Sequence, residues 1–200
     1  MIAARQPAVA GTFYPGNALQ LLASIEGYTT IVTEKQSVLG VVSPHAGYQY
    51  SGRVAGELYS RITIPDTVVI IAPNHTGYGV PYSLWPGGSW HTPLGNVEVH
   101  EEIVEELARS CDILEKDREA HLYEHAAEVQ IPFLQHFNPS VKIVVMVISS
   151  QNISDLRYIG MSLSRVLQRL SPHALVVASS DMTHYEPQAD ANKKDKIAIN

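Results

Sequence analysis

The sequence lacks the features that mark secreted and membrane proteins. Cys111 is the single cysteine among 200 residues, which excludes an internal disulfide and favours a reducing cytoplasm. The longest apolar run, residues 143–148, has the length of a strand and is far short of a membrane span. Residues 1–7 lack a basic segment followed by an apolar stretch, so they do not resemble a signal peptide. We therefore expect a cytoplasmic protein that does not cross a membrane.

Positive charge is also scarce. The 14 lysines and arginines do not cluster, and 20 acidic residues give a net charge of -6, so nucleic acid is not an expected partner. The chain has no G-x-S-x-G elbow, no dinucleotide-binding glycine motif and no P-loop, so serine-hydrolase chemistry and nucleotide binding have no motif support. With 45% apolar and 17% charged residues, the composition is that of an ordinary globular domain with a full core.

Buried strands alternate with amphipathic helices along the chain. Apolar runs predict strands at residues 38–42, 67–72, 82–86, 142–149 and 174–178. Helical spacing of apolar residues predicts helices at residues 52–62, 100–114, 124–137 and 153–170. Because the strands are apolar on both faces, this order indicates an α/β domain with a largely parallel central sheet covered by helices on both faces.

Two local features qualify this picture. Cys111 falls on the apolar face of a predicted helix, so we expect it to pack as a small core residue. Residues 190–200 begin like a helix and stop without a cap or a following element. The chain is therefore expected to lack a C-terminal segment of its natural fold unit.

Three predicted strands run into polar clusters that contain a histidine. His45, His75 and His184 each follow a strand, and Asp181 precedes the last of them. Ligands in open α/β sheets bind at the carboxyl ends of strands, so these histidines can converge on one pocket. Imidazole suits iron, zinc and copper, so one metal site and three separate hydrogen-bonding loop residues are both open interpretations of this pattern. Asp181 is a candidate metal ligand, an orienting partner of His184, or a cap for the following turn.

A second cluster has the form H-x-x-E-H, with His121, Glu124 and His125. This is the inverted zinc-protease signature, which requires a helix through both histidines and a third ligand on another helix. Two other interpretations are open. The cluster is a polar helix face, or Glu124, His125 and Glu128 turn into the same pocket as the strand-end histidines.

Longer motifs resemble those of the Memo family, in family order and over nearly the whole chain. The matching segments are Arg-x-Pro and Ala-Gly-x-Phe-Tyr-Pro within residues 5–15, Pro-His-Ala-Gly-Tyr-x-Tyr-Ser-Gly at 44–52, Pro-Asn-His at 73–75, Trp-x-Thr-Pro-Leu-Gly at 90–95, Glu-His-Ala-Ala-Glu-Val-Gln-Ile-Pro-Phe-Leu at 124–134, and Ser-Ser-Asp-x-x-His-Tyr at 179–185. The resemblance implies one domain over residues 1–200, with a fold like that of the class III extradiol dioxygenases, which use non-haem iron.

The resemblance also implies a ligand set. His45 and His75 resemble the two metal-binding histidines, and His184 resembles the pocket histidine that serves the dioxygenases as acid and base. Members of the family typically carry a cysteine ligand near the C-terminus, in a segment that this sequence does not reach, and Cys111 stands in a different motif context. The implied metal is Fe(II) or copper, with zinc as a further candidate.

Three functions follow as hypotheses. The first is a metal-dependent redox enzyme with an unknown substrate, in which His184 and Asp181 move a proton and Glu124 and His125 position the substrate. The second is a non-enzymatic scaffold that binds a peptide or partner protein in a vestigial pocket. The third is a zinc protease built on His121 and His125. The resemblance further implies radical-SAM and AMMECR-type proteins as pathway partners, and the sequence does not specify the substrate or the oligomeric state.

Overall fold

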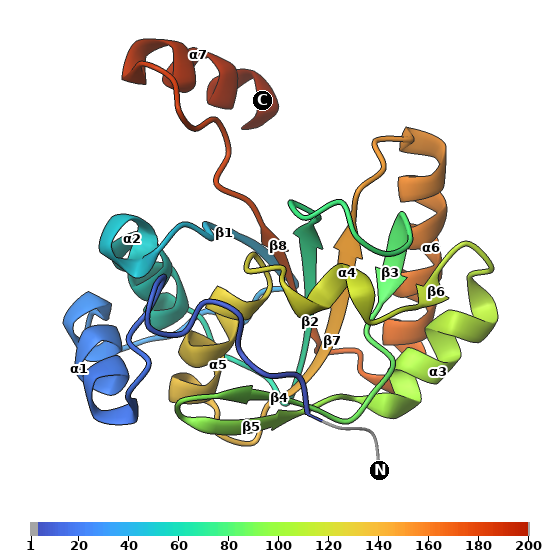
Figure 1. Cartoon of the computed structure of the whole chain (residues 1–200), viewed down its shortest axis with the longest axis horizontal. Helices are drawn as coiled ribbons and strands as arrows, with labels where there is room; N and C mark the ends of the chain where they lie inside the picture. The colour runs from blue at the N-terminus through green and yellow to red at the C-terminus, as the bar shows by residue number, and fades with distance from the viewer. Residues whose placement is uncertain (1–3, 200) are drawn as a thin grey trace.

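The computed structural model describes residues 4–199 (Figure 1). Its central sheet has six strands in the order β1-β8-β2-β7-β3-β6. These strands are β1 (Gly40–Ser43), β2 (Thr67–Pro73), β3 (Tyr82–Leu84), β6 (Glu115–Lys116), β7 (Lys142–Ile148) and β8 (Leu175–Ser179). A separate antiparallel hairpin consists of β4 (Ser89–Thr92) and β5 (Gly95–Glu98). Residues 1–3 of the segment considered for a signal peptide, and residue 200 of the predicted C-terminal helix, lie outside the described residues.

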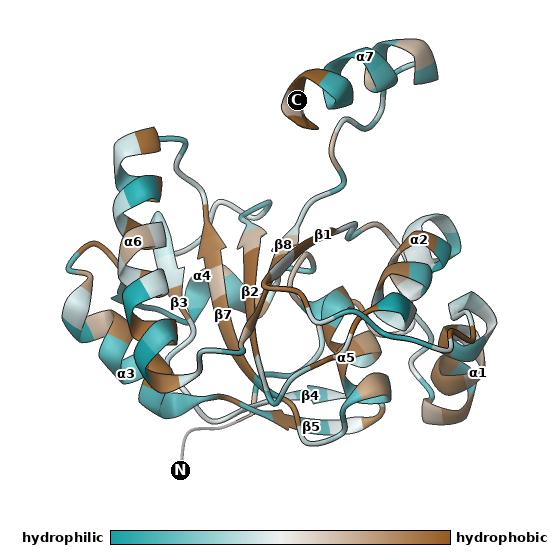
Figure 2. Cartoon of the chain, turned by 180° about the vertical axis from the view of Figure 1, so that it is seen from behind, coloured by the Kyte–Doolittle hydropathy of each residue, from teal (hydrophilic) through white to brown (hydrophobic). Residues whose placement is uncertain are grey.

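Helices cover both faces of the sheet, as expected. They are α1 (Ala18–Tyr28), α2 (Tyr48–Arg61), α3 (Glu101–Ser110), α4 (Glu119–Leu122), the 3-10 helix η1 (Glu128–Gln130), α5 (Ile131–Phe137), α6 (Ile153–Leu170) and α7 (Gln188–Ile199). The connections β1-α2-β2 and β7-α6-β8 cross the sheet in opposite directions, and right-handed crossovers therefore place α2 and α6 on opposite faces. On the face covered by α2, this helix contacts α1 and α5, and on the opposite face α6 contacts α3 (Figures 1 and 2).

The predicted α/β class is confirmed, with a largely parallel sheet. β1, β8, β2 and β7 are parallel neighbours, whereas β3 runs antiparallel to β7 and is parallel to β6. The central strands are apolar because both faces are covered, and residues 67–70 and 143–147 are all buried. Cys111 is fully buried in the same core, which confirms its predicted packing role.

Several parts of the fold differ from the sequence-based expectation. Helix α1 and the β4-β5 hairpin were not predicted, and the helix expected at residues 124–137 begins later. Residues 125 and 126 instead donate their backbone N–H groups to the Glu124 carboxylate, which fixes a turn before η1. Pro132 then lies at the start of α5, where its missing N–H would be unpaired in any case.

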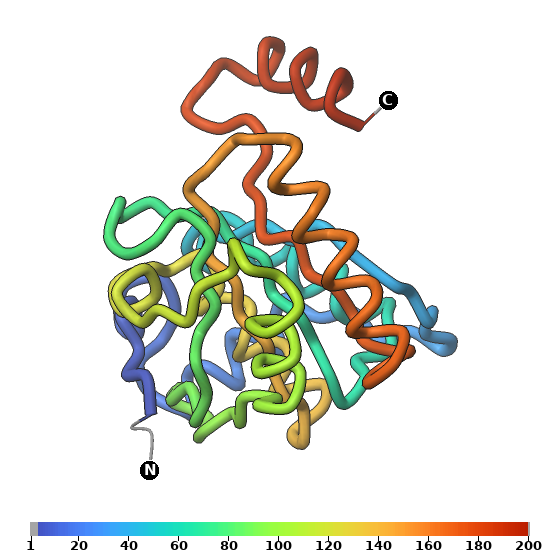
Figure 3. Tube along the Cα trace, turned by 90° about the vertical axis from the view of Figure 1, so that its right-hand side faces the viewer, coloured from blue at the N-terminus to red at the C-terminus, as the bar shows by residue number. Residues whose placement is uncertain are grey.

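Helix α7 stands apart from the body formed by the sheet and the other helices (Figure 3). It has no buried residue among those described, and the backbone N–H of Thr183 donates to its Asp195 side chain at 2.9 Å. Within residues 4–199, no helix combines the length and apolar character that a bilayer crossing requires.

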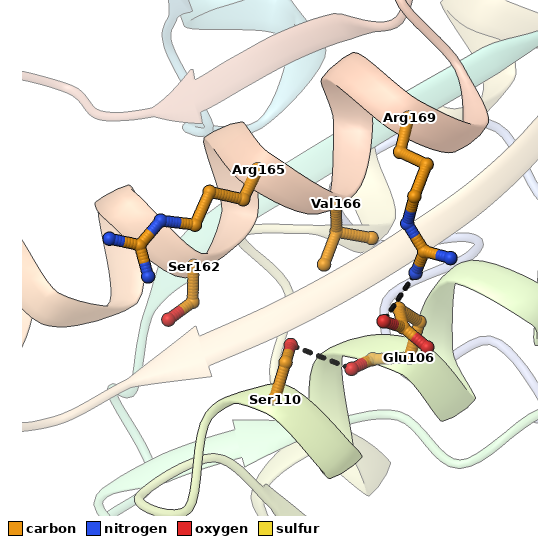
Figure 4. Close-up of a pocket in the computed structure, with 6 residues that line it drawn as sticks. All are labelled: Glu106, Ser110, Ser162, Arg165, Val166 and Arg169. Atoms are coloured by element: carbon orange, nitrogen blue, oxygen red, sulfur yellow. Dashed lines mark hydrogen bonds and ion pairs between the residues drawn. The ribbon is translucent and has the colours of Figure 1, made fainter.

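Helices α3 and α6 meet along a shallow groove whose polar groups serve the helix contact (Figure 4). Glu106 of α3 forms ion pairs with Arg169 of α6 and with Arg109 of its own helix. The Ser110 hydroxyl donates to the Glu106 carbonyl at 2.7 Å, whereas Arg165 extends along α6 away from Glu106. The groove contains no histidine or cysteine, so it is not the candidate metal site.

A buried ion pair joins the N-terminal segment to residues 121–128. Arg5 Nη1 lies 2.6 Å from Glu128 Oε2, and both side chains are buried. The guanidinium also donates to the carbonyls of His121 and Glu124, at 2.8 and 2.7 Å, and stacks over Trp90. Glu128 accepts three further hydrogen bonds, from the backbone of Ala8 and Val9 and from the Tyr14 hydroxyl. A buried pair with this many partners is costly to break by removing one charge.

We predict that Glu128→Gln lowers the free energy of unfolding by about 3 kcal/mol or more, because it leaves the Arg5 charge buried without its partner. Urea denaturation measures this loss. Glu57→Gln is the matched control, since its pair with Arg61 is exposed and is worth about 0.5 kcal/mol or less. Equal stability losses for the two variants would contradict the stabilising role of the buried Arg5–Glu128 ion pair.

A second prediction concerns the packing of α2 against α1. A Cβ at Gly56 would lie 2.5 Å from the Tyr28 carbonyl oxygen, whereas a Cβ at Gly160 in α6 meets nothing within 4 Å. We expect Gly56→Ala to destabilise the protein by about 1–3 kcal/mol through overpacking. Gly160→Ala should stabilise it by about 0.5–1 kcal/mol through helix propensity. Thermal unfolding of both variants tests the contrast, and a stabilised Gly56→Ala variant would show that the helices separate freely.

Candidate metal centre

Three histidines from separate loops meet at the carboxyl edge of the sheet. His45 and His75 each lie two residues beyond a strand, β1 and β2 respectively, and His125 comes from the turn before η1. One potential ligand atom from each of the three lies within 4.8 Å of the others. The ring centroids of His45 and His75 are 5.2 Å apart, and those of His75 and His125 are 4.6 Å apart. The arrangement is a group of imidazoles that could hold one metal ion.

The composition of this group differs from the sequence-based expectation. His45 and His75 lie together as predicted, but the third member is His125 and not His184. His184 lines the same cavity, is exposed, and packs its ring against Tyr185 at 4.8 Å. His125 was expected on a helix at residues 124–137, so the rule that strand-end loops meet did not place it beside His45 and His75. The open interpretation in which His125 turns toward the strand-end histidines agrees with its position.

The three histidines line a cavity of about 290 Å³. Phe13 packs against the His125 ring at 4.7 Å, and Tyr50 and Tyr185 line the same cavity with largely exposed side chains. This volume is close to the lower end of the range for small-molecule sites. The cavity therefore has space for a small ligand beside the imidazoles.

Glu124 orients His75. Its buried carboxylate lies 2.9 Å from His75 Nδ1 and accepts the backbone N–H of His75 at 2.5 Å. Burial alone would raise the pKa of Glu124, but hydrogen bonds from the His75 ring and from the backbone of Ala126 and His75 together hold that pKa below its usual value. An ionised carboxylate can only accept, so His75 Nδ1 carries a proton, and in the neutral ring the lone pair is then on Nε2.

Asp181 holds the loop that carries His45. Its Oδ1 accepts the backbone N–H groups of His45 and Ala46, at 2.5 and 3.0 Å, and its Oδ2 lies 3.7 Å from His45 Nε2. The expected contact between Asp181 and His184 is replaced by this one, because the loop after β8 lies beside the parallel loop after β1. The cap was expected for the turn that follows Asp181, whereas the observed hydrogen bonds hold the loop after β1.

Burial also sets the protonation state of two of the histidines. It lowers the pKa of both His45 and His125 below the ordinary value, outweighing the attraction of Asp181 for His45 and of Glu124 for His125. Both rings are therefore neutral near pH 7. Neutral imidazole is the form that coordinates a metal ion.

His121 is not part of this group, although it belongs to the H-x-x-E-H motif. Helix α4 ends at Leu122, so no helix joins His121 to His125 within this described segment. The His121 ring is fully buried beside Trp85, and its Nε2 lies 2.8 Å from Ser83 Oγ. Burial lowers the pKa of His121 to about 3. The helical geometry that the zinc-protease interpretation requires is not formed, and that interpretation is wrong for this chain.

Comparison with known proteins agrees with the motifs. A family model described as Memo-like protein matches residues 5–200. Two relatives named MEMO1 family protein, from Sulfurisphaera tokodaii and Metallosphaera sedula, are 44% and 41% identical to this chain and align with 98% of it. A third, from Archaeoglobus fulgidus, is 42% identical over the same share. The alignments cover 75%, 74% and 73% of these three relatives. On this evidence the chain belongs to the Memo family.

Proposed function

We propose that this protein binds one transition-metal ion through His45, His75 and His125. The observation that carries the proposal is the meeting of three imidazoles from three separate loops within 4.8 Å. Nitrogens bound to one ion at about 2.1 Å in tetrahedral geometry lie about 3.4 Å apart. The imidazole nitrogens, which lie within 4.8 Å of one another, would therefore have to approach by up to about 1.4 Å to share one ion.

The charges around the imidazoles also suit a divalent ion. Neutral histidines contribute no charge, while the carboxylates of Glu124 and Asp181 lie 2.9 Å from a His75 nitrogen and 3.7 Å from a His45 nitrogen. These outer carboxylates compensate a positive ion and orient its ligands. The cavity beside the rings leaves coordination positions for a substrate or water.

The proposed activity is a metal-dependent redox reaction on a small molecule that enters the cavity. Imidazole ligands suit Fe(II), copper and zinc, and the dioxygenase resemblance favours Fe(II) or copper. When bound, the metal would supply electron transfer and polarise a coordinated group. Glu124 holds His75, Asp181 holds the His45 loop, and His184 at the cavity wall is assigned the proton transfer to substrate.

A second candidate function is recognition of a peptide or partner protein at the same cavity. It is favoured by Tyr50 and Tyr185, whose side chains line the cavity while remaining 78% and 99% exposed. Exposed aromatic residues of this kind are typical anchors at interfaces. The radical-SAM and AMMECR-type partners implied by the resemblance would be tested in this setting, by pull-down with Tyr50→Ala and Tyr185→Ala variants in the presence and absence of metal.

We predict that His45→Ala, His75→Ala and His125→Ala each weaken metal binding by about 100-fold or more, because each removes one of three direct ligands. Anaerobic titration with Fe(II), and parallel titrations with copper and zinc, measure the affinity. His91→Ala is the control, since this ring is exposed and bonds to Asn96 on the hairpin. His184→Ala should retain metal affinity and lose turnover. Parent-like affinity in His45→Ala and His75→Ala would refute the site.

A further prediction separates the two buried carboxylates. Glu124→Gln should weaken metal binding by about 10–100-fold, because it removes the charge that orients His75. The Glu128→Gln variant should lose stability while its folded fraction keeps metal affinity within about twofold, since Glu128 is paired with Arg5 and, among the described residues, makes no hydrogen bond to the three imidazoles. Calorimetric titration below the unfolding temperature of both variants measures this. Equal losses of affinity would show that the effect is general destabilisation.

A further inference from the structure

No carboxylate contacts the Nδ1 side of the His45 ring, unlike that of His75, and Asp181 lies 3.7 Å from the Nε2 side. His45 Nδ1 instead lies 3.1 Å from the hydroxyl oxygen of Ser179, the last residue of β8. The same oxygen lies 2.7 Å from the Ala126 carbonyl and 2.9 Å from Gln130 Nε2. All four residues are buried, so each polar atom depends on these partners and not on solvent.

The direction of every hydrogen bond around Ser179 follows from groups that can only accept. The Pro44 carbonyl lies 2.8 Å from the Gln130 side chain, which must therefore present its NH₂ there, while the Tyr59 hydroxyl donates to Gln130 Oε1 at 2.8 Å. Gln130 thus donates to Ser179 Oγ. Ser179 donates its single hydroxyl proton to the Ala126 carbonyl. Its oxygen then has a lone pair left to accept a hydrogen bond from His45 Nδ1.

We propose that Ser179 is a positioning residue that holds His45 in the tautomer with the proton on Nδ1, so that the Nε2 lone pair is available to a metal ion. The inference rests on the proposed metal site and adds how one of its ligands is prepared. In the opposite tautomer, Ser179 would have to turn its proton from the Ala126 carbonyl to His45. The two oxygens at 2.7 Å would then face each other without a proton, and a buried acceptor would lose its partner.

The two proposed ligands therefore have second partners of different charge. A carboxylate behind His75 raises the basicity of that imidazole, whereas a hydroxyl that already donates elsewhere fixes the His45 tautomer without adding charge. His45 becomes the neutral, fixed ligand of the pair, and His75 the more strongly donating one.

The parent protein without metal gives the first test. Long-range ¹H–¹⁵N correlation NMR of the ¹⁵N-histidine-labelled full chain at pH 7.5 distinguishes the two ring nitrogens, with His45→Gln used to assign the signals. We expect His45 to show a protonated Nδ1 and an unprotonated Nε2. A protonated Nε2 in the folded parent overturns the proposal, and this measurement needs no variant at Ser179.

Variants give the second test. Ser179→Ala should lose the preference for Nδ1–H and weaken zinc binding by about tenfold or more, and Ser179→Thr should restore both through its hydroxyl. Ser43→Ala is the matched control, because Ser43 is the register partner of Ser179 on β1 and no hydrogen bond joins its buried hydroxyl to His45 among the described residues. A folded Ser179→Ala variant with parent-like tautomer and affinity overturns the proposal. A parent that binds no metal but shows Nδ1–H would refute the metal site alone.

Discussion

A buried carboxylate has to be compensated by hydrogen bonds, and Glu124 meets this requirement with groups that build the centre. It binds the ring and backbone of His75 and accepts the backbone N–H groups of His125 and Ala126. These bonds keep residues 124–127 out of a helix. The His125 side chain therefore projects from a turn and lies beside the rings of His45 and His75. The orientation of His75 and the local backbone shape thus depend on the same charge.

The Glu124 turn is itself held from behind. Arg5 donates to the Glu124 carbonyl and pairs with Glu128, so that the N-terminal segment and the turn before η1 form one buried unit. Val9 and Tyr14 add further bonds to Glu128. Residues 5–15 and 124–134 are therefore in direct contact although they are distant along the chain. These two segments form one hydrogen-bond network, which lies behind the turn that carries His125.

Much of this could be predicted from the sequence. Runs of apolar residues define the central strands, and the rule that loops meet at the carboxyl ends of parallel strands brings His45 and His75 together. The same rule fails for His125, because its place depends on side-chain bonds from Glu124 that override the helical pattern of residues 124–137. It fails differently for His184, since the loop after β8 directs Asp181 to the His45 backbone and leaves His184 exposed. Pattern rules describe the backbone, whereas these two placements follow from individual polar contacts.

The three imidazoles are not held alike, and the difference bears on their chemistry. His45 and His75 each have a hydrogen-bonded Nδ1, at 3.1 and 2.9 Å, whereas His125 Nδ1 lies 3.4 Å from Glu124. The His125 ring is placed by packing instead, stacked on His75 and in contact with Phe13. A ring held by packing turns at lower cost than one held by buried hydrogen bonds, because no polar atom loses its partner. His125 can therefore face either an ion or a small molecule in the cavity. It would then combine metal binding, which the sequence patterns assigned to His45 and His75, with the positioning of substrate.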